Sequence, residues 1–273
     1  MVNPILTCPQ SNKPHHRKAQ YVHGFDSIWE ATMSYENTQL KLSYRANGDV
    51  VNETGQDPAL PRVTGFQRYW VGADLGQAND FSSAVVIKDQ CLPISTGDEV
   101  KLGPRERTVV FADKFKGVSY VSVVDYLIRL RNAPPFGGKS ELIIDGTSIG
   151  RVVSDMLTEQ SVDHTAVQMT GGQEWRRSGQ YVNASKTLMI ENLAVLFASG
   201  DLKFAHDLAM RSAIEEDLAT FTTQTTAAGN QIITQARNAS GHGDTGIALI
   251  VAGFASQYFP PQSIRVSRLS GWF

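Results

Sequence analysis

The order of apolar segments from residue 69 onward is the feature that most constrains the fold. Three β-rich segments come first, at 70–75, 83–88 and 108–115. Helical and strand-like patterns then alternate: we expect a helix at 118–132, a strand at 142–144, a helix at 149–159 and a strand at 165–169. Strands in direct succession favour antiparallel pairing, whereas strands separated by helices favour parallel pairing. The sequence therefore predicts an α/β fold with a mixed five-stranded sheet, a three-strand meander plus parallel strands, flanked by helices.

The segments after this sheet continue the helical cover. We expect a helix at 186–199, capped by Ser185 and closed by Gly200, then a helix at 207–219 and a strand at 230–236. A last helix starts near Asp244 and runs through IALIVAGFASQY, which is apolar nearly all round, so we expect it to be buried. In the helix at 118–132, the expected buried face holds Val121, Val124, Leu127 and Ile128.

The two ends of the chain differ in composition from this part. Residues 1–68 are polar, carry the basic run PHHRK and end in a stretch rich in Gly, Asn, Asp and Pro. We expect an N-terminal arm or incomplete subdomain there, partly disordered. The predicted domain spans 69–259, and the tail at 260–273 is expected to be irregular.

Composition limits the classes of protein. With 273 residues, 41% of them hydrophobic, the chain can bury one substantial core. The net charge of −2 creates no global positive field to attract nucleic acid. Two cysteines, Cys8 and Cys91, are too few for a disulfide framework or a zinc site. Without an apolar stretch of about 18 residues or a signal peptide, we expect a soluble protein of a reducing cytoplasm.

Three aspartates stand where the pattern does not explain them. Asp74 interrupts a strand, where Asp is disfavoured, within VGADLGQANDFSSAVVI. Asp145 ends the strand LeuIleIle, and Asp244 opens the apolar last helix. Because neighbouring parallel strands bring their carboxyl ends together, we expect Asp74 and Asp145 to lie side by side, with Asp244 completing the group.

Clustered carboxylates repel one another, and their burial is costly without a counter-charge. Divalent cations with a preference for oxygen ligands, Mg²⁺ or Mn²⁺, resolve that conflict. Two such ions about 3.5–4 Å apart can activate a water and stabilise a leaving oxygen in phosphodiester hydrolysis. Each acid also has a structural explanation: Asp145 can form a turn, Asp244 can be an N-cap, and Asp74 has the weakest structural reason.

Four segments in order resemble the nuclease domain of tailed-phage terminase large subunits, which belongs to the ribonuclease H-like superfamily. They are VGADLGQANDFSSAVVI, LIIDGTSIGRVVSDML, SKTLMIENLAVLFASGDLKF and GHGDTGIALIVAGFA. The resemblance implies that Asp74, Asp145 and Asp244 bind two catalytic Mg²⁺ or Mn²⁺ ions and that the chain cuts concatemeric DNA during phage or prophage genome packaging. It also implies double-stranded DNA, a packaging ATPase, a small terminase subunit and a portal as partners in the host bacterial cytoplasm, with no membrane.

The sequence departs from that family in two places. Many members carry His-Asp-Asp at the last site, whereas this chain has His242-Gly243-Asp244. No GxxxxGK[ST] phosphate loop occurs, so we do not expect this polypeptide to be a complete translocating motor.

Five further residues are candidates for DNA contact: Lys186, Arg176, Arg177, Arg151 and His242. Lys186 matches a basic residue that the family often has before its third helix, and the two arginines adjoin Trp175 in a polar loop. Each can equally be an ordinary surface or loop residue. With few basic residues, we expect weak, salt-sensitive and sequence-independent DNA binding.

Three other readings stay open. A non-catalytic packaging subunit would keep the fold without the chemistry. An actin-like ATPase also opens with an Asp-Leu-Gly hairpin, and AspGlyThrSerIleGly faintly resembles its second phosphate loop. A Holliday-junction resolvase shares the superfamily but is usually shorter and more basic.

Overall fold

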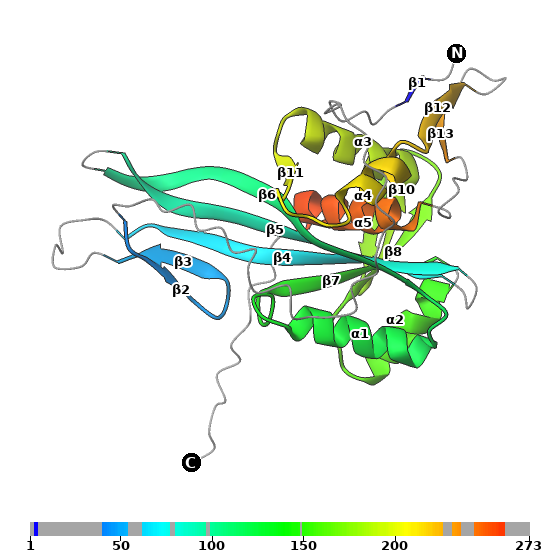
Figure 1. Cartoon of the computed structure of the whole chain (residues 1–273), viewed down its shortest axis with the longest axis horizontal. Helices are drawn as coiled ribbons and strands as arrows, with labels where there is room; N and C mark the ends of the chain where they lie inside the picture. The colour runs from blue at the N-terminus through cyan, green and yellow to red at the C-terminus, as the bar shows by residue number, and fades with distance from the viewer. Residues whose placement is uncertain are drawn as a thin grey trace.

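The computed structural model describes residues 3–4, 40–53, 62–76, 80–96, 99–147, 149–225, 231–235 and 243–259. Strands and helices form one large mixed sheet, a small second sheet and helices on both faces of the large one (Figure 1). The five helices of these residues are α1 (Tyr120–Asn132), α2 (Ile149–Glu159), α3 (Lys186–Ala198), α4 (Arg211–Leu218) and α5 (Asp244–Tyr258).

The large sheet has ten strands, which run in the order β11-β6-β5-β4-β7-β8-β10-β9, with β3 pairing to β4 and β2 to β3. They are β2 (Leu42–Tyr44), β3 (Asp49–Asn52), β4 (Thr64–Asp74), β5 (Phe81–Thr96), β6 (Glu99–Lys116), β7 (Ser140–Asp145), β8 (Thr165–Thr170), β9 (Trp175–Ser178), β10 (Tyr181–Ser185) and β11 (Leu202–Phe204). The second sheet joins β1 (Asn3–Pro4), β12 (Phe221–Thr225) and β13 (Gln231–Gln235).

The centre of the large sheet has the predicted topology. β4, β5 and β6 pair antiparallel as a meander, while β7 pairs parallel to β4 and β8 parallel to β7. The mixed α/β fold expected from the sequence is therefore confirmed. The carboxyl ends of β4, β7 and β8 lie together at one end of the sheet, as parallel pairing requires.

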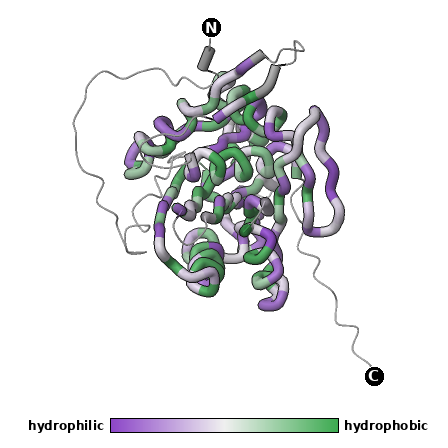
Figure 2. Tube along the Cα trace, turned by 90° about the vertical axis from the view of Figure 1, so that its right-hand side faces the viewer, coloured by the Kyte–Doolittle hydropathy of each residue, from purple (hydrophilic) through white to green (hydrophobic). Residues whose placement is uncertain are grey.

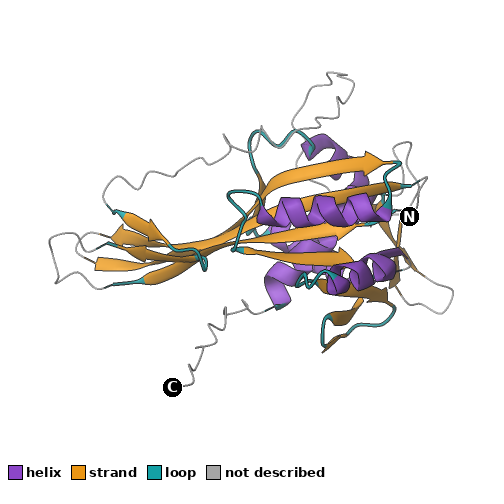
Figure 3. Ribbon diagram, turned by 90° about the horizontal axis from the view of Figure 1, so that it is seen from below, coloured by secondary structure: helices purple, strands orange, loops and turns teal. Residues whose placement is uncertain are grey.

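Three strands of the meander are much longer than predicted. β5 has 16 residues and β6 has 18, and their far ends extend beyond the helices as an arm together with β2 and β3 (Figures 1 and 3). Along one edge of β4, the first residues pair with β3 and the later ones with β7. The domain boundary expected at residue 69 thus falls inside β4, and residues 42–52 belong to the same sheet.

Alternating side chains of the central strands form two cores. Trp70, Val85 and Ile143 face α3, α4 and α5, whereas Val71 and Val86 face α1 and α2 on the opposite side. This is the period-two alternation of a sheet covered on both faces. Figure 2 shows the hydrophobic residues of the chain gathered in the interior between these layers.

Helix α5 lies at the centre of the core formed with α3 and α4. Every residue from Asp244 to Ser256 is buried, which confirms the predicted burial of this apolar helix. It packs closely on β4 because Gly72 has no side chain: a Cβ there would lie 2.1 Å from the carbonyl oxygen of Ala248. In the described part of the chain, no helix has the length and apolar character needed to cross a membrane.

Several local predictions were wrong. Val121 was placed on the buried face of α1 but is 57% exposed, and Val123 and Leu130 are buried instead. The fourth predicted helix begins only at Arg211, and the segment around Trp175, expected to be a loop, is strand β9. The pattern also missed β2, β3, β10, β11 and β12, which are short strands whose pairing depends on distant partners.

Candidate functional site

Four polar residues form a row across the end of the sheet. The β4–β7 register ends one residue before Asp74 and Asp145, which places these carboxylates on neighbouring strands. Asp74 pairs with Ser83 of β5, and Ser83 pairs with Lys114 of β6. Paired residues on adjacent strands point to the same face, here the face that α5 covers. We call Asp145, Asp74, Ser83 and Lys114 the acid row.

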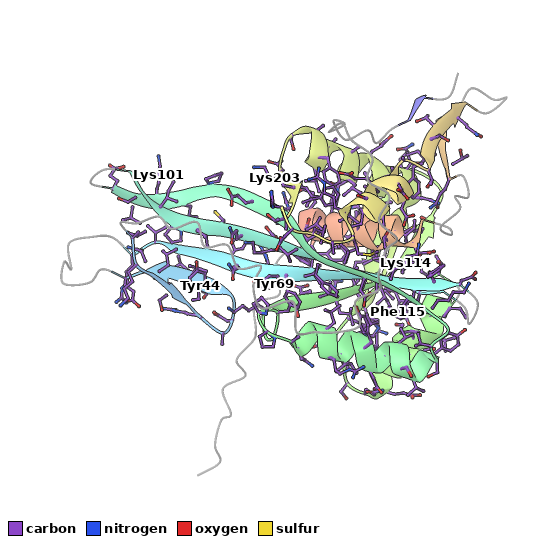
Figure 4. The ribbon with its side chains drawn as sticks, in the orientation of Figure 1. Tyr44, Tyr69, Lys101, Lys114, Phe115 and Lys203 are labelled. Carbon is purple, nitrogen blue, oxygen red and sulfur yellow. The ribbon has the colours of Figure 1, made fainter. Side chains whose placement is uncertain are left out.

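Helix α5 brings the third predicted acid to this row. The Ser83 hydroxyl donates a 2.7 Å hydrogen bond to the backbone carbonyl of Asp244, and the Lys114 ammonium lies 3.2 Å from the Asp244 Oδ2 atom. Figure 4 labels Lys114 and its neighbour Phe115, which point to opposite faces of β6. Phe115 contacts Tyr126 of α1, as alternation along a strand demands.

The start of α5 is held by a residue of another helix. Gly243, the N-cap, has a φ of +76° and no side chain that could bond a free helical amide. Asp217 of α4 takes that role: its Oδ2 atom accepts a hydrogen bond from the Thr245 backbone N–H at 3.0 Å and another from the Thr245 hydroxyl. The same oxygen lies 3.9 Å from the Lys114 ammonium. Lys114 therefore lies beside two buried carboxylates, Asp217 and Asp244.

Asp145 is fixed by its own turn. Its Oδ1 atom accepts hydrogen bonds from the backbone N–H of Thr147 at 2.9 Å and from the Thr147 hydroxyl at 2.8 Å. A turn of this kind is the structural role considered for Asp145 from the sequence. Both donors are neutral, so the turn orients the carboxylate without cancelling its charge.

The electrostatics of the row disfavour ionised carboxylates. Burial, followed by the negative charges of Asp145 and Asp244, raises the pKa of Asp74 well above its ordinary value. Burial also raises the pKa of Asp145, against the opposing effect of the Thr147 hydrogen bonds. Lys186 is close enough for Asp145 and Asp74 to favour its charged form, although burial lowers its pKa overall. The structure thus couples all three predicted acids through Asp74.

Counting charges shows what the site can hold. Four carboxylates (Asp74, Asp145, Asp217 and Asp244) lie near two ammonium groups, those of Lys114 and Lys186. The fully ionised cluster would carry an excess of two negative charges, and its acidic groups are oxygen donors. A hard divalent cation fits that charge and that chemistry.

The carboxylates are neighbours rather than a closed set of ligands. Within the described residues, no three Asp, Glu, His or Cys side chains are arranged as they would be around one ion. The Asp244 carboxylate is turned toward Lys114 instead. Metal ligation by Asp74, Asp145 and Asp244 therefore remains a proposal, and it requires a shift of side chains.

Of the predicted DNA-contact residues that the structure describes, Lys186 lies near the acid row, whereas Arg151 lies on α2, which covers the opposite face of the sheet. Lys186 opens α3, directly after its cap Ser185, whose side chain accepts a hydrogen bond from the Leu188 N–H as predicted. Arg151 is exposed in the first turn of α2, six residues after Asp145, and its guanidinium lies 5.8 Å from the centre of the Tyr181 ring.

The other two arginines lie farther along the sheet, on edge strand β9. The Arg176 side chain is 86% exposed and lies 4.0 Å from Glu174. Arg177 donates hydrogen bonds to the Gly179 carbonyl and the Thr165 hydroxyl, which gives it a structural role. His242 lies outside the described residues.

Sequence reasoning missed Lys114 and Asp217. The spacing of residues in the sequence could have indicated both. Lys114 follows Ala112 at the two-residue spacing of a buried strand face, and Asp217 follows the buried Ile214 by three residues on a helix. A charged residue at a core position indicates a buried polar partner.

A second polar cluster lies at the opposite end of α5. The fully buried Asp89 of β5 accepts hydrogen bonds from Arg105 through two guanidinium nitrogens, both at 2.7 Å, and from the Trp70 indole at 3.0 Å. Arg68 lies 3.4 Å from the same carboxylate. Arg105 and Arg107 also donate to the Ser256 carbonyl near the end of α5. We call Asp89 and its three arginines the arginine cluster.

Comparison with known proteins found similar solved structures but no matching sequence family. No family model matches the chain, and no curated protein sequence matches it. Among solved structures, the large terminase nuclease from thermophilic phage G20c matches with 22% identity and a TM-score of 0.47, over 80% of this chain and 92% of that one. The same nuclease with bound magnesium matches with 20% identity and a TM-score of 0.45, over 79% of this chain and 90% of that one.

The HK97 bacteriophage large terminase matches with 14% identity and a TM-score of 0.43, over 69% of this chain and 39% of that one. All of these likenesses have TM-scores below 0.5, so the function has to be argued from the residues of this site.

Proposed function

We propose that this chain is the nuclease of a phage or prophage DNA-packaging machine and that it hydrolyses DNA phosphodiesters with divalent metal ions. One observation carries the proposal: Asp74, Asp145 and Asp244, from three segments far apart in sequence, meet at the carboxyl end of the sheet with an excess of negative charge. Bringing buried carboxylates together lowers the stability of the fold, so a role in binding is the better explanation for the cluster.

Asp74, Asp145 and Asp244 are the proposed ligands of two Mg²⁺ or Mn²⁺ ions. Bound there, the ions would activate a water and stabilise the leaving oxygen, giving a 3′-hydroxyl and a 5′-phosphate by analogy with the superfamily. Within this mechanism, Asp74 is central because it is coupled to both other acids. Thr147 keeps the Asp145 carboxylate oriented.

The substrate is proposed to be concatemeric double-stranded DNA. Lys186 is the best-placed residue for phosphate contact beside the acid row, because Asp145 and Asp74 both act on its charge. Arg151, on the helix that covers the opposite face, and Arg176 are weaker candidates, and Arg177 is the weakest because its guanidinium already bonds within the fold. The net charge of −2 supports weak intrinsic affinity. A packaging ATPase, a small terminase subunit and a portal in the host cytoplasm are the proposed partners that deliver DNA.

A plasmid-nicking assay with Mg²⁺ or Mn²⁺ tests the proposal. We expect the parent chain to nick plasmid at low salt, EDTA to stop it, and Asp74→Asn and Asp244→Asn each to lower the rate by at least about 100-fold. Asp155→Asn is the matched control, because Asp155 is an exposed carboxylate on α2 outside the acid row.

The main alternative is a non-catalytic packaging subunit. Two observations favour it: glycine stands at position 243, where many family members have Asp, and the Lys114 ammonium pairs with the Asp244 carboxylate. A pure parent chain that binds no Mn²⁺ and leaves plasmid intact would establish this alternative. DNA binding without cleavage would be its remaining activity.

An actin-like ATPase is less well supported. Thr147, in the segment that resembles a phosphate loop, has its hydroxyl bonded to Asp145. The segment APPFGGKS at 133–140 ends in Gly-Lys-Ser but lies between helix α1 and strand β7, the reverse of the strand–loop–helix order of a phosphate loop. Nucleotide binding without DNA cleavage would favour this reading.

A further inference from the structure

The carboxylates at this end of the sheet differ in their contact with positive charge, and Lys114 makes the difference. Its ammonium lies 3.2 Å from Asp244, and the side chain is buried. In the described residues, by contrast, no Lys, Arg or His lies within ion-pair distance of Asp74 or Asp145. One end of the proposed metal site therefore has a lysine at ion-pair distance, whereas at the other end Lys186 acts on Asp145 and Asp74 only from farther away.

The Lys114 ammonium also has alternative partners close by. Asp217 lies 3.9 Å from the ammonium, and the Phe81 ring centre lies 4.8 Å from it. Both groups stabilise a cation, the first by charge and the second by its π face. The ammonium can therefore leave Asp244 and remain paired with Asp217, without an unpaired charge being left in the core.

We propose that Lys114 competes with a metal ion for Asp244, so that the two ions bind in sequence. Asp74 and Asp145 would hold one ion without the displacement of a lysine at ion-pair distance. Asp244 would become a ligand of the other ion only when the Lys114 ammonium moves from Asp244 toward Asp217. This inference rests on the proposed function, because it concerns the same metal site, and it makes Lys114 a positioning residue that sets the affinity of the second ion.

Isothermal titration calorimetry of the full chain with Mn²⁺, in the absence of DNA, tests the inference. For the parent we expect two unequal affinities. Lys114→Met removes the competing charge, so we expect the weaker affinity to rise roughly tenfold or more. Lys114→Arg keeps the charge and should leave the two affinities at least as far apart as in the parent.

Lys116→Met is the matched control. Lys116 lies on the same strand and face as Lys114, and its ammonium is 5.0 Å from the centre of the same Phe81 ring, but it has no ion pair among the described residues. Its loss should change neither affinity by more than about twofold, since an exposed charge is screened by water and salt.

The outcomes separate this inference from the proposed function. A parent that neither binds Mn²⁺ nor nicks DNA contradicts the proposed function. A parent that binds Mn²⁺ and nicks DNA, with two equal affinities or with a weaker site that Lys114→Met loosens or leaves unchanged, overturns only the role of Lys114. If Lys114→Met does not fold, Lys114→Arg decides: a weaker affinity raised tenfold in that variant contradicts competition by the charge.

Discussion

The two ends of helix α5 carry polar clusters of opposite character. At its C-terminal end, the Asp89 carboxylate accepts hydrogen bonds from Arg105 and lies close to Arg68. The Ser256 carbonyl of the helix also accepts hydrogen bonds from arginines. At its N-terminal end, the acid row and Asp244 bring three carboxylates together, and burial with mutual repulsion raises the pKa of Asp74. Both clusters lie on the same face of the same sheet.

The difference between the two clusters lies in how their charges are compensated. The arginine cluster places positive side chains at the negative end of the helix dipole and around a buried carboxylate, so the charges there favour the fold. The acid row places like charges together, which opposes folding unless something binds. The metal-binding role proposed above would account for this unfavourable charge.

The largest expected effect is at the arginine cluster. Asp89→Ala would leave Arg68, Arg105 and Arg107 near one another without their carboxylate. We expect the free energy of unfolding to fall by about 3–5 kcal/mol, measured by urea denaturation. The exposed Asp155→Ala should change it by less than about 0.5 kcal/mol. A loss below about 1 kcal/mol for Asp89→Ala would show that the cluster is not a structural element.

Gly243→Asp, which adds the acid that many family members have, should destabilise the chain rather than improve it. The backbone φ is +76°, and a Cβ would lie 2.2 Å from the Gln235 side-chain nitrogen, close to the existing acids. We expect a loss of about 1–2 kcal/mol, measured in EDTA.

Gly179→Asp is the control for that strain, because Gly179 has a φ of +61° and open space around its Cβ. The control should lose less, since it lacks the neighbouring carboxylates. Equal losses for the two variants would mean that the acid row does not repel a further negative charge.

Asp74→Asn should stabilise the metal-free chain while it removes cleavage. The folded-state pKa of Asp74 is raised above the ordinary 3.8, so over the interval between these values the native state keeps a proton that the unfolded state has lost. Stability of the parent therefore falls as the pH rises through that interval. The Asn variant cannot ionise, so its advantage should be absent near pH 4 and reach roughly 0.5–2 kcal/mol at neutral pH.

Thermal unfolding in EDTA at several pH values measures this advantage. Adding Mn²⁺ should stabilise the parent more than the variant, because the variant lacks a proposed ligand. A variant less stable than the parent at neutral pH would mean that Asp74 is satisfied in the fold and carries no electrostatic strain.

The smallest expected effect concerns DNA binding. Lys186→Ala should lower the slope of log affinity against log salt by about 0.9, because one phosphate contact is lost. Lys101→Ala removes an exposed lysine of the arm, far from the acid row, and should leave the slope unchanged (Figure 4). Fluorescence anisotropy with a labelled duplex measures both. Equal effects would extend the DNA-binding surface onto the arm.

The helix and strand patterns predicted the centre of this fold because they depend on local spacing. The helix at 149–159 has the bounds that the pattern predicts, and the fully buried α5 follows from its continuous apolar composition. The parallel pairing of β4 and β7 follows from the helix between them, so the proximity of Asp74 and Asp145 was predictable as well.

The arm and the strands β9 to β12 were not predictable in the same way. They are short or polar segments whose conformation is fixed by pairing with distant parts of the chain, as β11 pairs with β6. The long β5 and β6 likewise continue past the apolar segments that the pattern recognises, because β2 and β3 extend the sheet beside them.

The sequence by itself determined the order of the central elements, the burial of the last helix and the three acids, since periodicity and misplaced charges are visible in the order of residues. Only the tertiary structure decided which charged side chains lie next to those acids. Lys114 and Asp217 come to the start of α5 from a strand and a helix that are not adjacent to it in the sequence, because α5 packs across β4, β5 and β6 and against α4. Electrostatic energy depends on distances in space, so the balance of charge in the acid row is a property of the fold.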